Sequence, residues 1–113
     1  MVENDKFREG IALFNAGKYF ESHEVWEELW LAAAGDEKTF LQGLIQVAAA
    51  FHHHARGNWS GMRSLMAAGL MKLDPLPDCY RGIALGELRD GVRCWLEGSA
   101  EELEVHCPRI RLT

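Results

Sequence analysis

The chain has 113 residues, of which 48% are hydrophobic and 26% charged, and twelve basic against seventeen acidic side chains give it a formal net charge of −5. Such proportions are ordinary for a globular protein, and a chain of this length buries enough surface to fold as one domain without disulfides. The acidic balance, with no lysine or arginine cluster, excludes nucleic acid as an expected partner, because binding there depends on neutralising phosphates.

The beginning of the chain and its cysteines indicate a soluble cytoplasmic protein. The opening segment MVENDKFREG is charged and lacks the apolar core of a signal peptide. The longest apolar run, residues 44–51, is too short to span a bilayer. Cys79, Cys94 and Cys107 have no metal-ligand spacing, and free thiols are typical of a reducing compartment. We therefore expect no membrane partner.

The first predicted elements are two helices joined by a tight turn. Apolar residues at i, i+4 and i+7 from Phe7 predict a helix over residues 5–16, and Gly17 is a stop signal. A second helix is expected over residues 19–33. Because the connection is short, the two helices should form an antiparallel hairpin.

Three further helices follow, and the first of them is the most apolar. It is predicted over residues 37–56, with Asp36 as its N-cap, and should be largely buried. Asn58 is the expected N-cap of the next helix, residues 59–73. A proline-containing break precedes a fifth helix that ends at Gly98. The residues expected in the core are Trp26, Leu29, Phe40, Leu44, Val47, Phe51, Leu65 and Leu88.

The end of the chain differs from the rest. Residues 99–102 have a capping-box pattern that predicts one more helical turn, and residues 106–113 are expected to form an extended tail. No strand pattern precedes that tail. The predicted fold class is all-α, a single domain over residues 1–113, built as a five-helix bundle of successive antiparallel hairpins with an extended C-terminal tail.

Two polar lines on neighbouring helices are the candidate site. His23 and Glu27 stand at i and i+4 on the second helix, and Trp30 continues their line at i+7. Gln46 and His53 form a second line on the third helix, also at helical spacing. If the two helices pack through these edges, all four polar residues should meet in one cluster.

The cluster has two interpretations. In the functional one, His23, Glu27 and His53 are the two-histidine, one-carboxylate ligands of a divalent metal ion, with Gln46 and Trp30 beside the bound ligand. In the structural one, the same groups only satisfy one another's hydrogen bonds, since an unpaired buried polar group is costly. A small-molecule ligand and a homo-oligomer are kept as candidate partners.

Three consecutive histidines, residues 52–54, do not make a metal site by themselves. Successive helical residues diverge by about 100°, so the three imidazoles cannot converge on one ion. We expect His53 to point inward, because it continues the line of Gln46, and His52 and His54 to lie at the surface.

The segments FNAGKYFESHEVWEELW and FLQGLIQVAAAFHH, with the RGN that follows, resemble the small bacterial and archaeal domain-of-unknown-function family 309. That family joins an HxxxExxW helix to a helix reading QGLIQxAA before a histidine, and the resemblance covers residues 14–73 well and residues 80–83 in outline. It implies an all-helical fold and the metal-dependent hydrolase activity with which its members are often labelled. Where the family often has an acid after Gly-Ile, this chain has Ala84, so any role of that acid is missing.

The resemblance suggests hydrolysis as the chemistry of the site. A bound metal would lower the pKa of a water, and Glu24 or Glu27 would act as general base. The rival class is a helical-hairpin interaction module without catalysis, for which an exposed apolar patch, for example around Trp59, is the expected feature.

Overall fold

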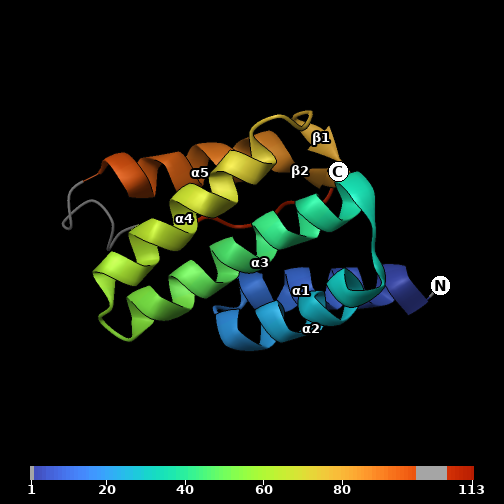
Figure 1. Ribbon diagram of the computed structural model, residues 1–113, viewed down its shortest axis with the longest axis horizontal. Helices are drawn as coiled ribbons and strands as arrows, with labels where there is room; N and C mark the ends of the chain where they lie inside the picture. The colour runs from blue at the N-terminus through green and yellow to red at the C-terminus, as the bar shows by residue number, and fades with distance from the viewer. Residues whose placement is uncertain (1, 99–106) are drawn as a thin grey trace.

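The computed structural model of the chain describes residues 2–98 and 107–113, and in these ranges the fold is helical with one small β-hairpin (Figure 1). The all-α prediction is confirmed. The predicted helical turn at residues 99–102 lies outside the described residues. The elements are α1 (Val2–Asn15), α2 (Tyr19–Ala32), α3 (Gly35–Ala55), α4 (Trp59–Leu73), β1 (Cys79–Tyr80), β2 (Ile83–Ala84) and α5 (Leu85–Glu97).

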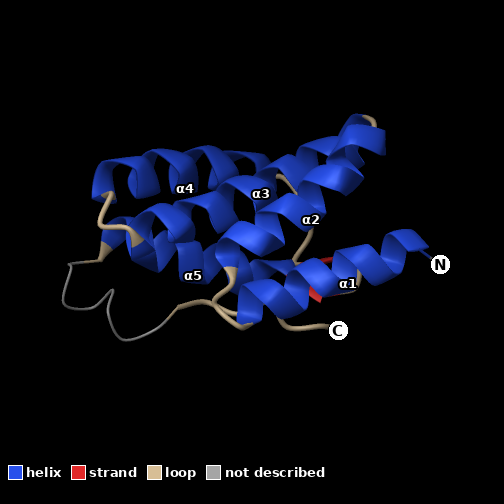
Figure 2. Cartoon of the chain, turned by 90° about the horizontal axis from the view of Figure 1, so that it is seen from below, coloured by secondary structure: helices blue, strands red, loops and turns tan. Residues whose placement is uncertain are grey.

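The helices form two layers. In both views α2, α3 and α4 lie side by side, with α3 in the middle, while α1 and α5 lie behind them (Figures 1 and 2). Each helix runs back along its predecessor in the front layer, as the short connections predict. None of the described helices combines the length and the apolar character that crossing a membrane requires.

The core lies between the layers, and α3 is its centre. Six of the eight residues expected in the core are buried, but Leu29 and Leu65 are only half-buried. Both of these pack against the edge of the core. Their apolar periodicity therefore correctly predicted which side of each helix faces the core, but it overestimated how deeply the two side chains are buried. The six buried residues are Trp26, Phe40, Leu44, Val47, Phe51 and Leu88.

Glycine allows α3 and α4 to approach closely. A Cβ built on Gly69 of α4 would lie 2.9 Å from the carbonyl oxygen of Gly43 in α3, and one built on Gly43 would lie 2.8 Å from the side chain of Leu73. No alanine fits at either position without a shift of its neighbours. The crossing therefore fixes how α4 lies along α3.

Of the two predicted N-cap residues, one is confirmed and the other is wrong. Asn58 caps α4 as expected, because its Oδ1 accepts a hydrogen bond from Gly61 N at 3.0 Å. The prediction that Asp36 caps the third helix is wrong: α3 begins at Gly35, Ala34 is the N-cap, and Asp36 lies in the first turn. There its carboxylate still complements the positive end of the helix dipole.

A two-stranded hairpin precedes α5, although no strand was expected before the tail. Cys79 and Tyr80 pair with Ala84 and Ile83, and the turn residues Arg81 and Gly82 have φ values of 52° and 78°. Two positive φ values in a two-residue loop are typical of a type I′ turn. Strands of two residues leave no alternation to detect, and arginine is an unusual residue at this turn.

The C-terminal tail is extended, as predicted, and lies against β2. Thr113 N donates to Gly82 O and Ala84 N donates to Arg111 O, each at 2.8 Å, and Ile83 forms an antiparallel bridge with Leu112. The tail thus extends the hairpin by one short strand-like segment.

Candidate functional site

The outer side of α3 carries the polar line that the sequence singled out. Gln42, Gln46, Ala49 and His53 are half-buried and stand on the side of α3 opposite to its core-facing residues. Helices α2 and α4 flank α3 on either side (Figure 1), and Gln42 is the residue of this strip that lines a hollow.

His23 and Glu27 form the pair that their spacing predicted. His23 Nε2 lies 2.9 Å from Glu27 Oε1, and His23 Nδ1 lies 3.1 Å from the carbonyl oxygen of Phe20. Both ring nitrogens therefore face oxygen atoms, so the imidazole donates to both when it carries two protons. Glu24 is exposed and has no ion pair or side-chain hydrogen bond with any described residue.

Gln46 and His53 do not join that pair, because both are turned toward α4. Gln46 Oε1 accepts a hydrogen bond from Lys72 Nζ at 2.9 Å, and His53 Nδ1 lies 3.0 Å from Asn58 Nδ2. The residues of α3 that face α2 stand about 100° back round the helix from these two, at the positions immediately before them. Ile45 lines a hollow together with α2 residues, and His52 lies against Phe20 of α2.

The three consecutive histidines diverge, as expected, but none is a plain surface residue. His52 lies against the ring of Phe20, with a centroid distance of 5.3 Å, while His54 lies edge-on to Trp59 and Trp95, at 4.8 Å from each. All three histidines are half-buried. The expectation that His52 and His54 lie at the surface and His53 inward is therefore wrong, because each imidazole packs against a different helix or loop.

The donor set predicted for a metal is not assembled as a group. His23 and Glu27 offer one nitrogen and one oxygen ligand, whereas His53 is bonded to Asn58. Among the side chains that the structure describes, in residues 5–98 and 107–113, no three His, Cys, Asp or Glu residues are placed to share one ion. The side chains present thus fit two ligands rather than three.

A hollow between α2 and α3, which we name the α2–α3 groove, lies beside the His23–Glu27 pair. It has a volume of about 290 Å³, close to the lower end of ordinary ligand sites. Trp30 and Leu31 form its α2 wall, and Leu31 is 72% exposed. Its complete lining is Glu27, Trp30, Leu31, Gln42 and Ile45.

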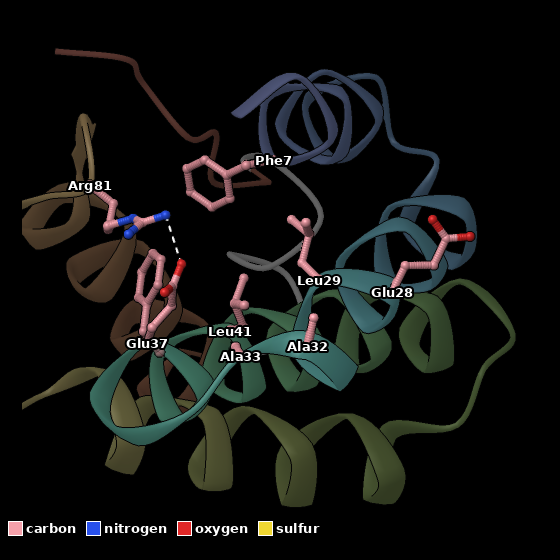
Figure 3. A pocket seen from close by; sticks show the side chains of 9 residues that line it. Phe7, Glu28, Leu29, Ala32, Ala33, Glu37, Leu41 and Arg81 are labelled. Carbon is pink, nitrogen blue, oxygen red and sulfur yellow. Dashed lines mark ion pairs between the residues drawn. The ribbon is translucent and has the colours of Figure 1, made fainter. Parts of the chain in front are cut away.

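A second, smaller cavity lies at the other edge of α2, between α1, α3 and the β-turn. Figure 3 shows Phe7 and Leu29 pointing into it, with Arg81 reaching toward Glu37 across one side. The guanidinium of Arg81 lies 2.7 Å from the Glu37 carboxylate, and Glu28 at the rim is paired with Lys6. With about 110 Å³ and charges that are already paired, this cavity has little room for a ligand.

Comparison with known proteins assigns the chain to a family. The sequence model of the family described as "Domain of unknown function (DUF309)" matches residues 7–65, which contain all residues of the α2–α3 groove. The chain belongs to this family. The DUF309 match reaches from α1 into α4 and leaves the β-hairpin and α5 outside.

Two relatives of this DUF309 protein are described as uncharacterized proteins. The chain is 33% identical over 88 residues to an uncharacterized protein of Aquifex aeolicus, and 44% identical over 50 residues to the uncharacterized protein YpuF of Bacillus subtilis. These alignments cover 77% and 43% of the chain but only 26% and 29% of the relatives, so the chain spans less than a third of either.

A solved structure shares both sequence and fold. The crystal structure of a conserved hypothetical protein from Thermus thermophilus is similar with a TM-score of 0.69 and 36% identity. The superposition covers 80% of this chain and 95% of the other. The helical arrangement is thus common to both proteins, and the site must be judged by its own chemistry.

Proposed function

We propose that this DUF309 domain is a ligand-binding module and that the α2–α3 groove takes a small, partly apolar molecule. The observation that carries the proposal is the convergence of Trp30 and Leu31 from α2 with Gln42 and Ile45 from α3 around one hollow. A leucine that is 72% exposed beside a half-buried indole offers apolar area that a ligand can cover.

The polar groups of the groove give such a ligand its orientation. The Gln42 amide both donates and accepts hydrogen bonds, and the second carboxylate oxygen of Glu27 is not used by His23. A mainly apolar hollow with a few convergent polar groups is the usual composition of a small-molecule site. His23 holds the Glu27 carboxylate in place through the 2.9 Å contact.

Binding of a neutral probe tests the proposal. The probe 3-phenylpropanamide, which has an aromatic body and an uncharged amide, should shift the NMR signals of groove residues, and Leu31→Ala should weaken its binding. Met71→Ala is the matched control, because Met71 is 76% exposed but does not line the groove. Equal weakening by both variants, or by neither, would contradict the proposed site.

A hydrolytic use of the same place is the second candidate, and the His23–Glu27 contact favours it. Glu27, rather than His23, would be the general base, because both nitrogens of His23 already face oxygen atoms. The test is turnover of a panel of simple esters and phosphoesters. Activity that is lost in Glu27→Gln and kept in Glu24→Gln would favour hydrolysis over binding alone.

A divalent ion on this pair is a separate proposal, supported by one imidazole and one carboxylate at a shared edge. Because the described residues supply two ligands and not three, no reaction step is assigned to an ion. Elemental analysis of protein purified without an affinity tag or chelator tests the point. Metal retained by the native chain and by His53→Ala, but lost in His23→Ala and in Glu27→Ala, would place the ion on this pair; loss in all three variants would establish the three-ligand set instead.

A further inference from the structure

Another hollow, distinct from the small cavity beside α1, adjoins the α2–α3 groove. Its lining differs from that of the groove in charge. The hollow has a volume of about 360 Å³ and lies toward α4. Trp30 and Gln42 line both hollows, so the two are neighbours, and we refer to them together as the depression. We name the second one the lysine hollow, and its lining is Trp30, Lys38, Thr39, Gln42 and Lys72.

Two lysines in this hollow have no carboxylate partner among the described residues. The ammonium of Lys38 lies 4.2 Å from the centre of the Trp30 ring, and Lys72 Nζ donates only to the amide oxygen of Gln46, at 2.9 Å. Among the other ten lysines and arginines, Arg8, Lys18, Arg56, Arg63 and Arg109 likewise have no carboxylate partner among the described residues, whereas five are paired with carboxylates. These five are Lys6, Arg81, Arg89, Arg93 and Arg111.

Glu37, the residue after Asp36 in the first turn of α3, does not neutralise the charge of the lysine hollow. Glu37 points to the other side of the helix, where its carboxylate pairs with Arg81 at 2.7 Å. Glu27 belongs to the other end of the depression and is paired with His23. In a chain with a net charge of −5, the depression thus has one locally cationic end.

The two ammonium groups are suited to an anion. Each carries three N–H donors, and Lys72 uses one of them on Gln46, so donors remain on both side chains. Hydrogen bonds from a charged donor to a carboxylate or phosphate are stronger than neutral ones. The Trp30 ring holds Lys38 in place by a cation–π contact, which reduces the cost of ordering that side chain on binding.

We propose that Lys38 and Lys72 form an anion subsite, so that the ligand of the groove carries a carboxylate or phosphate group on an apolar body. The proposal rests on the ligand-binding function proposed above and names the class of its ligand. The apolar body lies against Leu31 and Ile45, and the anionic group lies between the two ammonium groups.

The experiment compares an acid with its neutral twin. 3-Phenylpropionate and 3-phenylpropanamide have the same shape and differ by one charge, and phenyl phosphate serves as the phosphate arm. Each is titrated into the 113-residue chain and followed by the NMR signals of the Trp30 indole N–H and of α3 amides. The acid should bind about three- to tenfold more tightly than the amide at low salt, as two partly exposed charge contacts imply, with the advantage falling as salt rises.

Variants of the lysines show where the charge effect arises. In the double variant Lys38→Met, Lys72→Met the acid and the amide should bind equally, whereas Lys18→Met, at the opposite end of α2, should keep the preference. Phenyl phosphate that outcompetes the acid would identify phosphate as the preferred anion within the same subsite. Circular dichroism and thermal melting of each variant confirm that the fold is intact.

The outcomes separate the subsite from the groove. Equal binding of acid and amide to the native protein, or a preference that survives the double variant, would overturn the anion subsite while leaving the groove as a binding site. If no probe moves the Trp30 signal, the groove itself is not a binding site, and the subsite is overturned with it.

Discussion

Gly43 and Gly69 face each other where α3 crosses α4, so closely that a Cβ on Gly69 would lie 2.9 Å from the Gly43 carbonyl oxygen and 3.0 Å from Val47 Cγ2. The backbone carbonyl cannot rotate away as a flexible side chain can. This contact places α4 beside the outer strip of α3 and brings Lys72 to the lysine hollow.

Gly69→Ala should therefore destabilise the protein, although alanine is the better helix former. Helix propensity alone predicts a gain of up to about 1 kcal/mol, whereas overpacking at a tight helix contact costs about 1–3 kcal/mol. We expect a net loss of about 1–2 kcal/mol in the free energy of unfolding, measured by urea denaturation. An increase in the free energy of unfolding close to the value expected from helix propensity alone would show that α3 and α4 can move apart to accommodate the methyl group.

Leu44 tests the core. Its side chain is fully buried at the centre of α3, so Leu44→Ala should cost about 2–5 kcal/mol of unfolding free energy. Leu31→Ala, at a position that is 72% exposed, should change stability by less than about 0.5 kcal/mol in the same denaturation experiment. Comparable losses at the two positions would mean that the buried face of the bundle has been misassigned.

Ala84 occupies the N-cap position of α5 and makes no side-chain capping hydrogen bond. Ala84→Ser supplies an oxygen that can accept from the N–H of Glu87 in the first turn, since the N–H of Gly86 already donates to the Asp78 carbonyl oxygen, and such caps are worth about 0.5–2 kcal/mol. We expect a higher melting temperature in calorimetry. A lower one would indicate that the tight packing of Ala84 between β1 and the tail outweighs the cap.

Tyr19 predicts how stability depends on pH in the alkaline range. Burial, reinforced by a hydrogen bond to the Cys107 thiol, raises the pKa of the Tyr19 hydroxyl well above its ordinary value. A raised pKa in the folded state means that the stabilisation is complete below the unfolded pKa of about 10 and is lost as the pH rises beyond it. Unfolding free energy should thus fall above about pH 10, and fall less in Tyr19→Phe. An identical slope in both proteins would rule out this role.

The helices were predictable because the relevant signals are local. The periodicity of Phe40, Leu44 and Val47 identifies the buried side of α3 without any knowledge of its neighbours. Asn58 was predictable as a cap for the same reason, since the cap and the amide it binds are three residues apart.

The composition of the site was only half predictable. His23 and Glu27 meet within one helix, and their i, i+4 spacing was sufficient. Whether Gln46 and His53 face α2 or α4 depends on a rotation of about 100° about the axis of α3. That rotation is set by packing contacts such as Gly43 with Gly69, which no periodicity reports.

The lysines were missed for a related reason. Lys38 and Lys72 are far apart in the sequence and meet on one surface only because α4 returns along α3. The sequence signal that could have indicated these lysines as site residues was the Trp30–Lys38 pair, which spans the short turn between α2 and α3.

The central claim, that the α2–α3 groove binds a ligand, is tested most directly by fluorine NMR of protein labelled with 5-fluorotryptophan. The chain has four tryptophans: Trp26 and Trp95 are buried, Trp30 lines the groove, and Trp59 packs against His54 on another part of the surface. On addition of 3-phenylpropionate, the resonance that is absent from Trp30→Phe should shift with saturation, while the Trp59 resonance stays in place. A saturable shift of Trp59 with an unchanged Trp30 would contradict the claim and favour an interaction surface around Trp59 instead.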